Sequence, residues 1–99
     1  MTVFFDNAQQ RLTVSGDLTL DSVQQKMTET ELVFKDNQAL EIDLAEVSKS
    51  DSAGLALLIH WLRKAHQIEK KLVYTNMPTQ MLAMARACGL EEILPLQTK

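Results

Sequence analysis

The sequence has little of the chemistry on which several classes of protein depend. It contains one cysteine, Cys88, and three glycines among 99 residues. A single cysteine excludes an intrachain disulfide and favours a reducing compartment. The scattered glycines form no glycine-rich phosphate loop of the P-loop or dinucleotide type. We therefore expect no nucleotide and no other cofactor.

Long apolar runs and dense basic clusters are also missing. The apolar stretch at residues 52–61 is about half of the ~20 residues that cross a bilayer, and the N-terminus does not resemble a signal peptide. The net charge is −3, and an acidic residue interrupts the nearest approach to a basic patch, which is Arg63, Lys64, Lys70 and Lys71. We expect neither nucleic acid binding nor direct membrane insertion.

No pattern of catalytic or metal-binding residues is present. His60 and His66 are six residues apart, roughly 600° around a helix, so they point to different sides and cannot share a metal ion. Ser52 has no neighbouring histidine, because His60 is about two helical turns away. Cys88, among alanines, is predicted to be a small core residue. We expect no metal, no small-molecule substrate and no enzymatic activity.

Hydrophobic periodicity predicts alternating strands and helices. Strands are predicted at residues 3–5, 11–15, 40–44 and 72–74, with an edge strand around residues 93–96. Helices are predicted from Leu20 to about Val33, over residues 52–68, and over residues 81–88 with Gly89 as the C-terminal cap. Such alternation implies parallel strands joined by helical crossovers. The predicted fold class is α/β: one domain, residues 1–99, with a small mixed, mainly parallel sheet and three main helices.

The most informative segment is LEIDLAEVSKSDSAGLALLIHWLRKAHQ, residues 40–67. It is predicted to run from a buried strand through a polar loop into a helix that begins at the carboxyl edge of the sheet, where partners usually bind. Asp51 or Ser52 can serve as the helix N-cap. Gly54 costs up to ~1 kcal/mol relative to alanine, which suggests that another backbone approaches closely. Because Ala53 precedes it, the first turn of the helix has almost no side-chain bulk, which favours docking by a second protein.

The same helix has a wide apolar surface. Its hydrophobic residues cover an arc of about 200°, more than one sheet face requires. Leu57 and Trp61 lie on the flank of this arc. Trp61 either packs in the core or contacts a partner, and the sequence leaves both interpretations open.

These residues resemble a known family. The motif DSAGL at residues 51–55 follows the strand-forming segment LEIDLAEVSKS and precedes an apolar helix. This arrangement resembles the STAS domain, the fold of bacterial anti-sigma factor antagonists and of the ends of sulfate transporters. Within that family, DLAEVSKSDSAGLALLIHWLRKA is most similar to the STAS subunits of Mla-type phospholipid ABC transporters of Gram-negative bacteria.

The resemblance implies a non-catalytic accessory subunit that binds the ATPase subunit of the transporter and, through it, the permease. Such a subunit is cytoplasmic and peripheral at the inner membrane, and the transporter maintains the lipid asymmetry of the outer membrane. The hydroxyl residue after the motif's aspartate, here Ser52, is implied to matter for this role. The predicted partner-binding residues are Ser48, Lys49, Ser50, Asp51, Ser52, Ala53, Gly54, Leu57 and Trp61.

The resemblance also leaves a second function open, that of an anti-sigma factor antagonist regulated by serine phosphorylation. Antagonists are normally phosphorylated on the second hydroxyl residue after the aspartate, and this chain has Ala53 there. Ser52 remains as a possible phosphorylation site. A helix start tolerates the added negative charge, but the neighbouring Asp51 would repel it.

Overall fold

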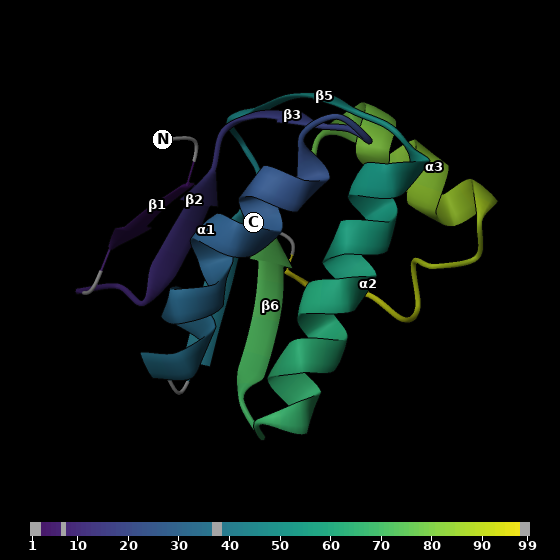
Figure 1. Ribbon diagram of the computed structural model, residues 1–99. Coiled ribbons are helices and arrows are strands. Elements are labelled where there is room, and N and C mark those ends of the chain that lie inside the picture. The colour runs from purple at the N-terminus through teal and green to yellow at the C-terminus, as the bar shows by residue number, and fades with distance from the viewer. Residues whose placement is uncertain (1–2, 7, 37–38, 98–99) are drawn as a thin grey trace.

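Strands and helices alternate along most of the chain (Figure 1). The structure is a computed structural model that describes residues 3–6, 8–36 and 39–97. The elements in chain order are β1 (Val3–Asp6), β2 (Arg11–Val14), β3 (Gly16–Leu18), α1 (Val23–Asp36), β4 (Ala39–Asp43), β5 (Val47–Ser50), α2 (Ser52–Gln67), β6 (Lys71–Thr75), α3 (Thr79–Ala87) and β7 (Leu96–Gln97).

The main sheet has five strands in the order β1-β2-β4-β6-β7. The β1–β2 hairpin is antiparallel, and the other pairs are parallel. In β2, the buried Leu12 and Val14 alternate with the half-buried Arg11 and Thr13, the pattern of a strand with one face toward the core. The predicted mixed, mainly parallel sheet with three helices is confirmed.

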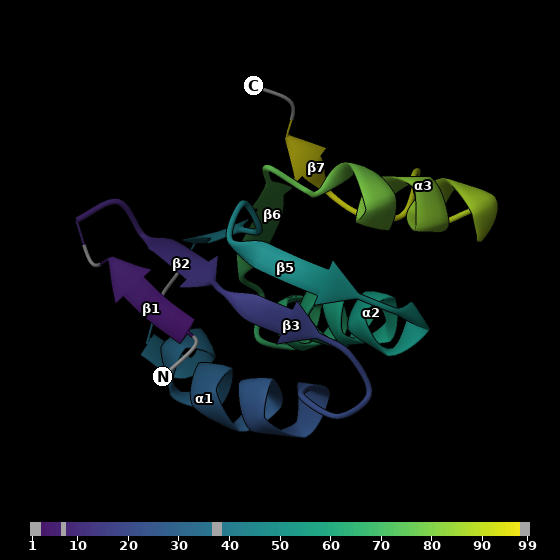
Figure 2. The ribbon, with the colours of Figure 1, turned by 90° about the horizontal axis from the view of Figure 1, so that it is seen from above.

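A second, two-stranded sheet of β3 and β5 was not predicted. These strands are parallel and lie above the carboxyl end of the main sheet (Figures 1 and 2). The prediction of a polar loop before α2 was therefore wrong: Ser48, Lys49 and Ser50 belong to β5. Only the first residue of β5, Val47, is buried, so the segment carries no hydrophobic alternation that a sequence could reveal.

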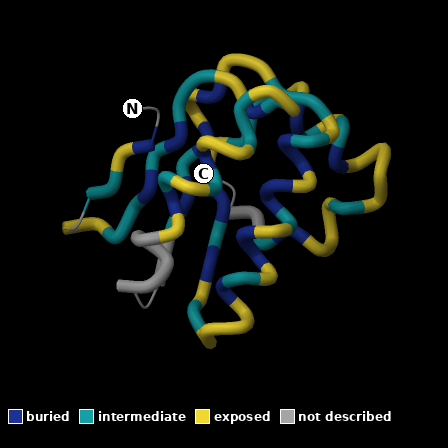
Figure 3. The backbone as a smooth tube through the Cα atoms, viewed as in Figure 1, coloured by how far each residue is buried: buried dark blue, intermediate teal, exposed yellow. Residues whose placement is uncertain are grey.

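Helices α1 and α2 pack side by side on one face of the sheet (Figure 2). Helix α2 contacts β6 on one side and α1 on the other. Figure 3 shows buried stretches along most of this helix; its buried residues are Gly54, Leu55, Leu57, Leu58, Trp61, Leu62 and Ala65. The wide apolar arc is explained by these two packing surfaces within the chain.

Helix α3 ends as predicted, but Cys88 at its C-terminus is exposed, whereas the sequence predicted it to be buried. Gly89 has φ +72°, and the backbone N–H of Leu90 donates to the Ala85 carbonyl, as in a left-handed C-terminal cap. The prediction that Cys88 is a core residue was wrong, because its side chain is exposed. Met81 and Ala85 form the buried side of α3, and Cys88 lies at the C-cap beyond the last buried turn.

Tyr74 on β6 is the one tyrosine of the sequence and is 1% exposed. Its hydroxyl donates to the Leu58 carbonyl of α2, and burial raises its pKa well above the usual value. Because the unfolded chain releases this proton near pH ~10 and the folded chain holds it, stability is fully present below that pH and is lost as the pH rises.

We therefore predict that the free energy of unfolding falls more steeply above pH ~10 in the wild type than in Tyr74→Phe, by up to about 1.4 kcal/mol per pH unit. Urea unfolding of both proteins between neutral and alkaline pH measures this difference. Tyrosinate absorbance, which reports Tyr74 alone, should appear together with unfolding. Equal pH slopes for the two proteins would contradict the prediction.

Candidate partner-binding site

Asp51 is the N-cap of α2, at the junction with β5. One carboxylate oxygen, Oδ1, accepts hydrogen bonds from the backbone N–H groups of Ala53 at 2.9 Å and Gly54 at 3.2 Å. The other, Oδ2, accepts from the Leu20 N–H at 3.2 Å, in the turn between β3 and α1. Of the two candidate caps, the structure selects Asp51. Its carboxylate also ties the start of α2 to the chain segment that leads into α1.

Ser52 is the first residue of α2 and is exposed. Since Asp51 provides the cap, the Ser52 hydroxyl is not needed to begin the helix. Within the described part of the chain, no hydrogen bond joins the Ser52 side chain to another residue. Its hydroxyl therefore points out from the helix start as a free donor and acceptor.

Gly54 is explained by a contact within the chain. A Cβ atom at this position would lie 2.3 Å from the backbone oxygen of Leu18, the last residue of β3. The expected close approach is therefore real, but the approaching backbone is that of β3. The inference that Gly54 contacts a partner is corrected by this burial: its main role is to let β3 pack on the first turn of α2.

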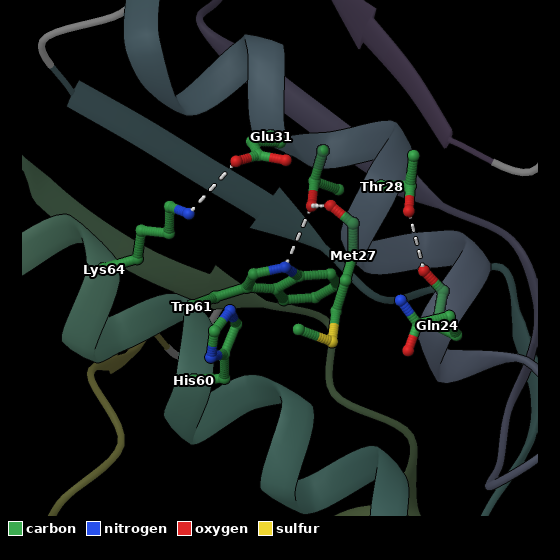
Figure 4. A pocket seen from close by; sticks show the side chains of 8 residues that line it. Gln24, Met27, Thr28, Glu31, His60, Trp61 and Lys64 are labelled. Carbon is green, nitrogen blue, oxygen red and sulfur yellow. Dashed lines mark hydrogen bonds and ion pairs between the residues drawn. The ribbon is translucent and has the colours of Figure 1, made fainter.

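Leu57 and Trp61, predicted to contact a partner, lie in the core. They are 3% and 1% exposed. The Trp61 indole Nε1–H donates to the Thr30 hydroxyl of α1 at 3.0 Å, and that hydroxyl donates in turn to α1 carbonyls (Figure 4). Trp61 therefore joins α1 to α2, and both side chains are almost wholly occupied by contacts within the chain.

The remaining predicted residues form a continuous surface. Ser48 and Lys49 on β5 are exposed, Ser50 and Asp51 are half-buried, and Ser52 follows at the start of α2. Ala53 faces a shallow apolar groove between α1 and α2. We call this set, residues 48–53, the Ser52 surface.

Sequence reasoning missed the contribution of α1 and the turn before it. Leu20 was predicted to be an apolar position of the helix, but it precedes α1 and is 74% exposed. Its place beside Asp51 follows from the β3–β5 pairing, which joins segments about thirty residues apart. No local sequence pattern predicts such a pairing.

Among the described residues, no three His, Cys, Asp or Glu side chains are grouped as a metal site requires. No helix in the described segments is both long and apolar enough to cross a membrane.

The fold is shared by solved structures of low sequence identity. One is the anti-sigma factor antagonist SpoIIAA in its unphosphorylated form, with a TM-score of 0.76 and 13% identity over 98% of this chain and 87% of that chain. Another is a putative anti-sigma factor antagonist from Thermotoga maritima, with a TM-score of 0.79 and 11% identity over 98% of this chain and 84% of that one. The sheet, the three helices and their order thus define a protein with the fold of anti-sigma factor antagonists.

The family is more specific than the fold. Residues 1–96 match the family described as Mlab, STAS domain, and the chain belongs to that family. No curated protein sequence matches the chain. STAS domain proteins are generally non-catalytic regulatory or accessory proteins that act through contacts with other proteins.

Proposed function

We propose that this chain is a non-catalytic accessory subunit of an Mla-type phospholipid ABC transporter, where it binds the ATPase subunit and supports its assembly or activity. Its family supports this partner class. The chain would reach the permease and the inner membrane only through the ATPase subunit, on the cytoplasmic side. The transporter would maintain the lipid asymmetry of the outer membrane.

The observation that carries the proposal is the exposed Ser52 hydroxyl. The fold does not use this hydroxyl, because Asp51 caps α2. It stands on the first turn of a helix, among exposed β5 residues and next to the apolar groove. An exposed hydroxyl beside an apolar groove is suited to a directional hydrogen bond within a protein interface.

Substitutions at Ser52 test this proposal. Ser52→Ala should weaken binding of the purified ATPase subunit by about three- to tenfold, because one interface hydrogen bond is lost. Ser52→Arg should weaken it by about tenfold or more, because a long charged side chain would hold the surfaces apart. Titration calorimetry with the wild type and each variant measures the dissociation constants.

A matched control is available at the start of α3. Thr79 is the first residue of α3 as Ser52 is of α2, and it too is exposed. Thr79→Ala should bind the ATPase subunit as the wild type does. Wild-type affinity in both Ser52 variants would remove Ser52 from the interface, and no binding by the wild type would refute the proposed partner.

The second candidate function is that of an anti-sigma factor antagonist regulated by phosphorylation of Ser52. Its support is the fold shared with SpoIIAA and the Thermotoga maritima protein. Against it, the Ala53 and Gly54 N–H groups already donate hydrogen bonds to the Asp51 carboxylate, so they are not available to bind a phosphate on Ser52. Intact mass measured after incubation with ATP and cell extract distinguishes the two, since only an antagonist of this kind should gain a phosphate.

A further inference from the structure

Leu20 places a large aliphatic side chain in solvent beside the Ser52 surface. It is 74% exposed, yet its backbone is held in place by the 3.2 Å hydrogen bond from its N–H to Asp51 Oδ2. The same carboxylate accepts a hydrogen bond from the Ala53 N–H, so Asp51 holds both Leu20 and the first turn of α2. A single exposed leucine is ordinary, and its meaning depends on what surrounds it.

An apolar groove lies between α1 and α2, and Asp51 connects it to Leu20, because the Asp51 carboxylate accepts from the N–H groups of both Leu20 and the groove residue Ala53. Its volume is about 260 Å³, and it is lined from α1 and α2 by Val23, Met27, Ala53, Ala56, Leu57 and His60. The alanines leave space for a partner's backbone to approach. A second hollow of about 190 Å³ shares Met27 and His60 and continues toward the Lys64–Glu31 ion pair (Figure 4). Both volumes are below the ~300–1,000 Å³ of small-molecule pockets, so side chains of a protein suit them better.

The chain on either side of Leu20 lines an acidic hollow. This hollow, of about 560 Å³, includes Thr19 and Asp21, and its ionisable lining residues are Asp17, Asp21, Asp51 and Lys49. Three carboxylates against one ammonium group give this edge a net negative charge. A partner that covers Leu20 from the groove side would bring its own flank against this edge, and complementarity requires that flank to be basic.

We propose that the groove between α1 and α2, with Leu20 and the acidic edge beside it, receives an amphipathic helix of the ATPase subunit that carries Lys or Arg along one flank. The proposal rests on the proposed function and extends the Ser52 surface along α2. A groove between two helices is the geometry in which a third helix packs, with apolar side chains every three or four residues as anchors. Leu20 is the apolar contact at the entrance of the groove.

Two variants test the groove, and a third tests the acidic edge. Leu20→Ser removes the apolar contact, and Ala56→Arg fills the groove from an exposed helical position with a good helix former. Each should weaken ATPase-subunit binding by about tenfold or more. Asp21→Lys should slow association and reduce its dependence on ionic strength, because it removes part of the attraction to a basic flank. Surface plasmon resonance with purified ATPase subunit measures the rates and affinities.

The matched control is Ile93→Ser, which removes another exposed aliphatic side chain, 56% exposed, that lines neither the groove nor the acidic hollow. It should bind as the wild type does, and melting temperatures should show all four variants folded. If the wild type binds and the Leu20 and Ala56 variants bind equally well, the groove proposal is wrong while the proposed function stands. If Asp21→Lys binds with the same dependence on ionic strength as the wild type, the inference that the partner helix has a basic flank is wrong. If the wild type does not bind the ATPase subunit, both proposals fail.

Discussion

Replacing Gly54 with alanine is expected to lower the free energy of unfolding by about 2–3 kcal/mol, although alanine is the better helix former by ~1 kcal/mol. The added Cβ would lie 2.3 Å from the Leu18 backbone oxygen and 3.1 Å from the Leu18 Cβ. Leu18 is 0% exposed, and its carbonyl accepts the Asp51 N–H at 3.2 Å. A backbone group held in this way cannot move aside as a flexible side chain would, so β3 must shift from α2.

Urea unfolding followed by Trp61 fluorescence measures the effect, because Trp61 is the only tryptophan of the sequence. Gly89→Ala is the control. No atom within 4 Å would meet its Cβ, and its cost comes only from φ +72°, at about 1 kcal/mol. An alanine at position 54 that leaves the protein as stable as the wild type would mean that β3 does not pack on α2 in this way.

The Gly54 contact also affects how interface experiments are interpreted. A shift of β3 would disturb the Asp51 bonds to Leu20 and to the first turn of α2, and hence the placement of Ser52. Gly54→Ala is therefore expected to weaken ATPase-subunit binding without Gly54 touching the partner. Substitutions at the exposed Ser52 and Leu20 separate contact from folding, which a substitution at Gly54 cannot do.

The sequence predicted the parts of the fold whose signal is local. Strand β4 and helix α2 have clear periodicities, and the Gly89 cap has its own motif. Strands β3 and β5 have none, because each has three or four residues and their pairing depends on distant segments. The chain passes from β2 into β3 through Gly16 at φ +80°, a left-handed conformation that favours glycine.

The candidate site was also predicted only in part. The DSAGL motif located the start of α2, and Asp51 is its cap. The bare first turn and the wide apolar arc were both interpreted as signs of a partner, whereas β3 and α1 of the same chain account for Gly54, Leu57 and Trp61. A sequence shows that a small or apolar residue is required, but it does not show whether the neighbour belongs to the same chain.

Trp61→Ala is expected to destabilise the fold by about 3–5 kcal/mol, the largest single effect that we predict. The side chain is 1% exposed and packs where α1 meets α2, so its removal leaves a large cavity between the helices. Because folded domains are stable by only about 5–15 kcal/mol, this variant is expected to unfold at much lower urea concentrations than the wild type. Circular dichroism measures its unfolding, since the fluorescent residue is lost.

The indole hydrogen bond can be separated from the packing of the ring. Thr30→Val keeps the shape of the 1% exposed Thr30 but removes the acceptor of the Trp61 Nε1–H, and it should cost about 1–3 kcal/mol. Thr28→Val is the control, because the Thr28 hydroxyl is exposed on the same helix and bonds only to a carbonyl one turn earlier. It should change stability by less than about 0.5 kcal/mol.

A double-mutant cycle isolates the hydrogen bond. In the Trp61→Phe variant, which has no indole N–H, Thr30→Val should cost less than in the wild type, because no N–H group is left without its acceptor. An equal cost of Thr30→Val in both backgrounds would show that α1 and α2 are joined by ring packing alone.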